Sequence, residues 1–63
     1  MEPREFKILQ FRAKISNKDL AELLNVHVNT VSYWKSGYRR ITPSMEKFIK
    51  MVIEKYIREK ENE

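Results

Sequence analysis

The sequence contains no cysteine, only one glycine and only two prolines among its 63 residues. Without thiols the chain forms neither disulfides nor cysteine-ligated metal sites, so its stability must come from packing or from association. Aliphatic runs are short, the longest being Met51-Val52-Ile53, which excludes a membrane-spanning helix. No charged-then-apolar leader opens the chain, so we expect a cytoplasmic protein.

The length of the chain limits what it can build. A domain this small buries only ~60% of its unfolded surface, which is too little for a deep catalytic cleft. Asp19 and Glu22 share a helix face but have no nucleophile or histidine near them in the sequence. We therefore expect residues 1–63 to form a single domain with no enzymatic activity, no cofactor, no metal and no small-molecule effector.

Acidic residues are missing between positions 23 and 45, although the whole chain carries nine. The same window contains three cations and three aromatic side chains: Lys35, Arg39 and Arg40, with Tyr33, Trp34 and Tyr38. Together with a net charge of +4, this composition favours a surface that faces phosphates. The alternative is an ordinary solvated face.

Apolar residues recur at helical spacing, and no alternating run is long enough for a strand, so we expect an all-α fold. Four helices are predicted, with a fifth possible. The first begins at Pro3, the second at the Ser16–Asp19 capping box, and the third occupies about residues 28–36. Gly37 can adopt the left-handed conformation that ends the third helix. Thr42 and Pro43 then begin a last helix that runs to about residue 60.

The segment from Asn17 to Trp34 carries the most specific pattern. Ala21 supplies a small residue where a second helix must cross closely, and Asn25 lies at a sharp turn that requires positive φ. Five apolar residues fall at the positions that face inward: Leu20, Leu24, Val26, Val31 and Trp34. This spacing predicts a helix-turn-helix with a short connection at residues 25–27.

These residues resemble the Cro and phage-repressor type of helix-turn-helix proteins, which are lambda-repressor-like. Residues 16–26 look like the first helix and turn of that family, and residues 30–32 with Trp34 and Gly37 look like its second helix and stop. The similarity covers about residues 4–53. It implies a helical bundle that binds operator DNA as a symmetric dimer and regulates transcription. It also implies that the second helix of the motif faces base edges, while Asn17 and the basic loop hold phosphates.

Three departures from the family pattern stand out. Asn25 replaces the usual glycine, and His27 replaces a small hydroxyl cap. Lys35 stands where the family often has an acid that pairs with an arginine in the first helix. The matching position in the first helix is Gln10, so that buried pair is absent on both sides.

The outward face of the third helix is fixed because Val31 and Trp34 point inward. Asn29 can bond an adenine edge in bidentate fashion, and Val28 can cover a thymine methyl group. We predict that four residues read bases in the major groove: Val28, Asn29, Ser32 and Tyr33. A solvated or capping role for Asn29, and surface packing for Tyr33, are the alternatives.

Phosphate contacts are predicted for six residues: Asn17, His27, Lys35, Tyr38, Arg39 and Arg40. The last three follow the stop glycine, where a DNA strand would pass, and Asn17 lies beside the free amides of a helix start. Simple surface charge for Arg39 and Arg40, and a helix-start role for Asn17 or His27, are the alternatives.

The last helix carries a long apolar stripe. We assign its first members, Met45, Phe48, Ile49 and Val52, to the domain core. The next three, Ile53, Tyr56 and Ile57, are predicted to form a homodimer interface, unless they wrap the same core. A twofold dimer would present two recognition helices about 34 Å apart to a palindromic operator.

We therefore predict a sequence-specific regulator that binds double-stranded DNA, most simply a repressor that occupies an operator. The alternative is an antitoxin-like or adaptor module whose basic face is incidental. The salt dependence of affinity distinguishes these two functions, because a DNA complex weakens steeply as phosphate contacts are screened. A membrane-surface role is disfavoured, because the polar side of the last helix mixes acids with bases.

Overall fold

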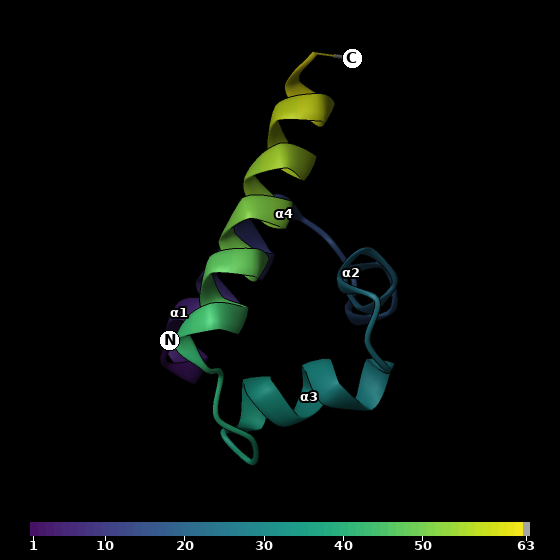
Figure 1. Ribbon diagram of the computed structural model, residues 1–63. Helices are drawn as coiled ribbons and strands as arrows, with labels where there is room; N and C mark the ends of the chain where they lie inside the picture. Colours follow the sequence, from purple (N-terminus) through teal and green to yellow (C-terminus); the bar gives the residue numbers. More distant parts are fainter. Residues whose placement is uncertain (63) are drawn as a thin grey trace.

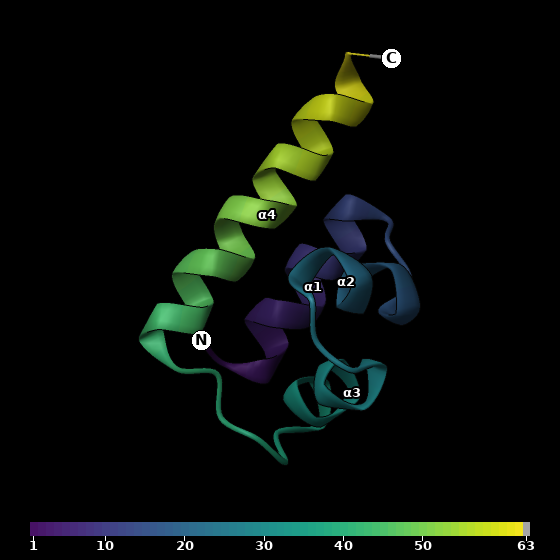
Figure 2. The same cartoon turned by 45° about the vertical axis from the view of Figure 1, so that its right-hand side comes forward.

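The computed structural model describes residues 1–62 and contains four α-helices. They are α1 (Pro3–Ala13), α2 (Asn17–Leu24), α3 (Val28–Ser36) and α4 (Pro43–Glu61). The all-α prediction is confirmed: residues 1–62 contain no strand, and the possible fifth helix does not form there. Helices α1 and α2 pack against α4, and α3 packs against α1 and α2. The C-terminal turns of α4 extend beyond the other three helices (Figures 1 and 2). None of these helices has both the length and the apolar character needed to cross a bilayer.

Each helix begins where the local chemistry favours it. The Ser16 hydroxyl accepts a hydrogen bond from the Asp19 backbone N–H at 3.1 Å, which caps α2. The Thr42 hydroxyl accepts a hydrogen bond from the Met45 backbone N–H at 3.2 Å, which caps α4. Helix α3 ends at Gly37, whose φ of 82° lies in the left-handed region. The predicted helix boundaries are therefore confirmed to within one residue.

The turn of the helix-turn-helix is built on Asn25, which has a φ of 57°. The Asn25 N–H donates to Glu22 O at 3.2 Å, and the Val26 N–H donates to Ala21 O at 3.0 Å. This pair of bonds is a Schellman motif, which uses the last free carbonyls of α2. Lys14 ends α1 in the same way with a φ of 54°, and no residue preference in the sequence indicates that turn.

The core draws on all four helices. Its largest fully buried side chains are Phe6, Leu20, Val31, Ile49 and Ile53. Trp34 packs edge-on against Phe6, with ring centroids 5.7 Å apart and an interplanar angle of 84°. Ile41, in the connection between α3 and α4, is also buried.

The prediction for Ile53 is wrong. Its side chain is 1% exposed and belongs to the core of the monomer, so it is not available to a partner chain. Ile53 follows Ile49 by one helical turn and lies on the same side of α4, which packs against α1 and α2. Tyr56 and Ile57 are half-buried at the edge of this core.

Several apolar residues lie at the surface, one of them contrary to prediction. Phe48 precedes Ile49 and is turned about 100° away around the helix, so it is 37% exposed rather than in the core. Leu23 on α2 is likewise 44% exposed. Phe11 is 83% exposed, whereas the neighbouring apolar position Ile15 is buried.

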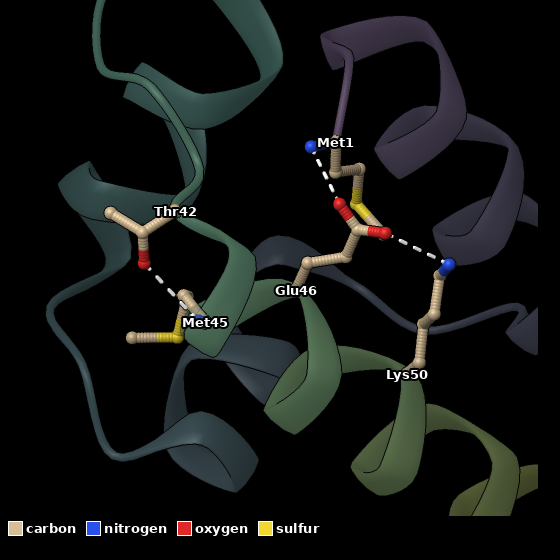
Figure 3. A network of polar contacts seen from close by, with 5 residues as sticks. All are labelled: Met1, Thr42, Met45, Glu46 and Lys50. Carbon is tan, nitrogen blue, oxygen red and sulfur yellow. Dashed lines mark hydrogen bonds and ion pairs between the residues drawn. The ribbon is translucent and has the colours of Figure 1, made fainter.

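An ion-pair network joins the start of the chain to α4 (Figure 3). The Met1 ammonium lies 2.6 Å from Glu46 Oε1, and Lys50 Nζ lies 2.9 Å from Glu46 Oε2. The hydrogen bond from the amino terminus, followed by that from Lys50, lowers the pKa of Glu46. The same carboxylate raises the pKa of Lys50.

Candidate nucleic-acid interface

The outward face of α3 lies opposite its two buried residues. Val31 and Trp34 are buried, whereas Val28, Asn29 and Ser32 are exposed. None of these three outward side chains is charged, and their polar groups can pair with base edges. The structure thus places three of the four predicted base-reading residues on one free face at the first two turns of α3. The fourth, Tyr33, lies at its margin.

Tyr33 is half-buried because the loop after α3 folds back onto it. The Tyr33 and Tyr38 rings lie 5.0 Å apart, and the Arg39 guanidinium carbon lies 5.4 Å from the Tyr33 ring centroid. The Arg39 backbone N–H donates to Tyr33 O at 3.2 Å. Tyr33 therefore holds Tyr38 and Arg39 beside α3.

The basic loop is fixed at both ends. It leaves α3 through the left-handed Gly37, and it returns to the core through Ile41, which is 4% exposed. Between these two anchors Arg39 and Arg40 are exposed, and Tyr38 is 77% exposed. The loop thus presents two cations next to the uncharged face of α3.

His27 caps the other end of α3. Its Nδ1 accepts a hydrogen bond from the Asn29 backbone N–H at 3.0 Å, so the imidazole does the work of the hydroxyl it replaces. An acceptor at Nδ1 places the proton of the neutral ring on Nε2. The exposed imidazole therefore has an N–H donor available for a phosphate oxygen, and capping does not compete with that contact.

Asn17 lies at the first residue of α2, where α1 and α3 also approach. Its Oδ1 accepts hydrogen bonds from Gln10 Nε2 at 2.7 Å and from Lys35 Nζ at 3.1 Å. Gln10 Nε2 also donates to Ile15 O at 3.1 Å, and the Gln10 side chain is 7% exposed. An amide-centred network thus takes the place of the charged pair that the family often has.

The role of Gln10 was missed in the sequence. It was identified only as one half of an absent pair, whereas it is the one buried polar residue among those that the structure describes. The available signal was its position opposite Lys35. Gln10 and Lys35 stand where the family often has two opposite charges, and both side chains can donate hydrogen bonds. A pair of donors needs an acceptor between them, and Asn17 supplies it.

The predicted phosphate-binding residues form two groups around α3. Asn17 and Lys35 are bonded to each other, and Tyr38 and Arg39 pack on Tyr33. His27 stands apart, at the N-terminal end of α3. Within residues 1–62, the ion pairs join Glu46 to Lys50 and to the amino terminus, so no carboxylate neutralises Lys35, Arg39 or Arg40.

Comparison with known proteins adds one match. A family model described as "Helix-turn-helix" matches residues 7–52, which include α2, the Asn25 turn, α3 and the basic loop. No curated protein and no solved structure matches the chain significantly. The matched range also includes Gln10, Asn17 and Lys35.

Proposed function

Because this chain belongs to the Cro and phage-repressor type of helix-turn-helix DNA-binding regulators, we propose that it is a sequence-specific transcriptional repressor. In this proposal it acts in the cytoplasm and occupies a palindromic operator as a homodimer. One observation carries the proposal. The exposed, uncharged face of α3 has side chains that can donate hydrogen bonds to phosphates at both of its ends, His27 at the start and Arg39 after the end. The family is one of regulators and is not typically enzymatic.

Base reading falls to the exposed start of α3, since the N-terminal residues of a recognition helix reach base edges first. Asn29 bonds an adenine edge, Val28 covers a thymine methyl group, and Ser32 donates or accepts at a neighbouring pair. Tyr33 reaches the edge of the groove with its hydroxyl group, because its ring is engaged by Tyr38 and Arg39.

Phosphate binding falls to the groups that flank this face. Arg39 and Arg40 meet one strand from the loop after α3, together with Tyr38. His27 meets a phosphate through Nε2, while Asn17 and Lys35 do so at the start of α2. These contacts set the register of α3 in the groove and supply most of the salt-dependent affinity.

The dimer interface is proposed on the C-terminal half of α4, whose last turns extend beyond the other helices (Figure 1). Tyr56 and Ile57 are half-buried there, and Val52 and Phe48 continue the apolar surface from Tyr56 at intervals of one turn. A twofold axis between two copies of α4 would present both α3 helices to one side of a duplex. Sedimentation tests this: a monomer well above micromolar concentration, with and without operator DNA, would contradict it.

The decisive experiment is selection of bound sequences from random duplex DNA, followed by two variants. A palindromic consensus supports both the reading face and the dimer. Asn29→Ala should relax base preference at one position per half-site by ~1–3 kcal/mol, whereas Arg39→Ala should weaken binding to all sequences alike and lower the salt slope by ~1. Equal losses on every DNA for both variants would refute this division of roles.

Salt titration also tests the rival class. A partner complex whose affinity barely responds to salt, with no selected DNA consensus, would indicate the antitoxin-like or adaptor function instead.

A further inference from the structure

The side-chain amide of Asn17 has a fixed polarity. Both of its hydrogen-bond partners, Gln10 Nε2 at 2.7 Å and Lys35 Nζ at 3.1 Å, contact the oxygen Oδ1. A lysine ammonium can only donate, so the Asn17 atom that faces it must be the oxygen. The orientation of Gln10 is determined in the same way, because Ile15 O can only accept from its NH2 group.

This arrangement leaves the NH2 group of Asn17 as the part of the side chain that can bind a ligand. Among residues 1–62, no acceptor bonds to that group, and no buried side-chain nitrogen or oxygen lacks a partner, so the group is accessible to solvent. It lies at the N-terminus of α2, where Ser16 already satisfies the N–H groups of Asp19 and Leu20. The preceding backbone amides remain for an anion.

We propose that Gln10 is a positioning residue for DNA binding: together with Lys35 it turns the Asn17 oxygen inward, so that the Asn17 NH2 group faces a backbone phosphate. This inference rests on the proposed DNA-binding function. The reversed amide would present its oxygen to the phosphate and repel it. Gln10 is 7% exposed and acts through Asn17, without touching DNA itself.

The variant Gln10→Glu tests the proposal because a carboxylate only accepts hydrogen bonds. It draws the Asn17 NH2 group and Lys35 inward and turns the Asn17 oxygen outward. Affinity for duplex DNA should fall by about tenfold, the loss of one hydrogen bond to a charged group. Ile8→Glu is the matched control, since it adds the same charge on the same helix at a position that is 51% exposed and has no part in the network. It should weaken binding much less.

A second measurement requires no DNA. In the free protein, NMR should show the Asn17 NH2 protons exchanging rapidly with water, and exchanging more slowly in Gln10→Glu, where they bond to the introduced carboxylate. Unchanged exchange in a folded Gln10→Glu protein would overturn the proposal even if the chain binds DNA. If exchange is slower in Gln10→Glu but the wild-type protein binds no DNA, the inferred orientation of the Asn17 amide stands and the DNA-binding function is refuted instead.

The Asn17→Ala background distinguishes positioning from a general electrostatic or stability effect. There, Gln10→Glu should cost no more affinity than Ile8→Glu, because the group that it reorients is gone. A tenfold loss that persists in this background would show that Gln10 acts through Lys35 or through charge alone, and would refute the proposal.

The introduced carboxylate also faces Ile15 O, so the unfolding curve of Gln10→Glu is first compared with that of the wild type. If it fails to fold, Gln10→Met decides the question, since it removes the donor without adding charge. Gln10→Met should weaken DNA binding several-fold when Asn17 is present and not at all in the Asn17→Ala background. Equal losses in both backgrounds would refute the proposal.

Discussion

Replacing Ile53 by alanine tests whether this residue serves the core or a dimer interface. The side chain is 1% exposed and lies in the cluster formed by all four helices. Truncating a buried isoleucine costs ~2–5 kcal/mol through lost transfer energy and the cavity left behind. A small domain has only ~5–15 kcal/mol of total stability, so the melting temperature should fall by more than ~10 °C.

The assay is thermal unfolding at two protein concentrations about two orders of magnitude apart. A core residue lowers the melting temperature of Ile53→Ala equally at both concentrations, because the lost contacts lie within one chain. An interface residue matters only where the dimer forms, so its effect would vanish on dilution. Wild-type-like unfolding of Ile53→Ala in dilute solution would refute our assignment of Ile53 to the core.

Two further variants complete this experiment. Met51→Ala, at a position that is 60% exposed on the same helix, should change stability by less than ~0.5 kcal/mol. Ile53→Val should cost ~0.5–1.5 kcal/mol and remains measurable if the alanine variant does not fold.

Three other predictions concern helix ends and the ion-pair network. The folded protein lowers the pKa of Glu46, so the stability that its carboxylate contributes is complete above the ordinary glutamate pKa and is lost as pH falls through the lowered value. The difference in melting temperature between wild type and Glu46→Gln should therefore shrink towards acidic pH, and a constant difference would contradict this. Asn25→Ala should cost ~1–2 kcal/mol in urea unfolding because φ is positive there, whereas Asn25→Gly should cost nothing; equal stabilities would exclude conformational strain as the cause. His27→Ala should lower the free energy of unfolding by ~0.5–2 kcal/mol through loss of the helix cap, and His27→Ser should restore it. Wild-type DNA affinity in His27→Ser would show that His27 caps α3 but makes no phosphate contact.

Most of the helix boundaries are predictable because they depend on nearby residues. Ser16 and Thr42 cap the helices that they precede, and Gly37 and Asn25 are residue types that tolerate positive φ. Lys14 adopts positive φ as well, but lysine has no preference for it, so only the surrounding packing reveals that turn.

Side-chain burial and contacts are not predictable from the sequence where several helices meet. The apolar stripe of α4 is wide, and the spacing alone does not say which edge the other helices cover. Packing against α1 and α2 buries Ile53 and leaves Phe48 at the surface, contrary to prediction. The amide network likewise joins residues from three helices, so neither Gln10 nor Lys35 indicates it separately.

Trp34 gives the protein an internal optical probe. It is the single indole of the chain, and it is enclosed against the ring of Phe6 on the side of α3 that faces away from the proposed groove surface. Its fluorescence will therefore shift to longer wavelength when the helices separate and water reaches the ring. A duplex bound to the proposed groove surface would, by contrast, lie closer to Tyr33 and Tyr38. Quenching of tyrosine emission would then report association, and a red shift of tryptophan emission would report denaturation, as separate signals from one sample.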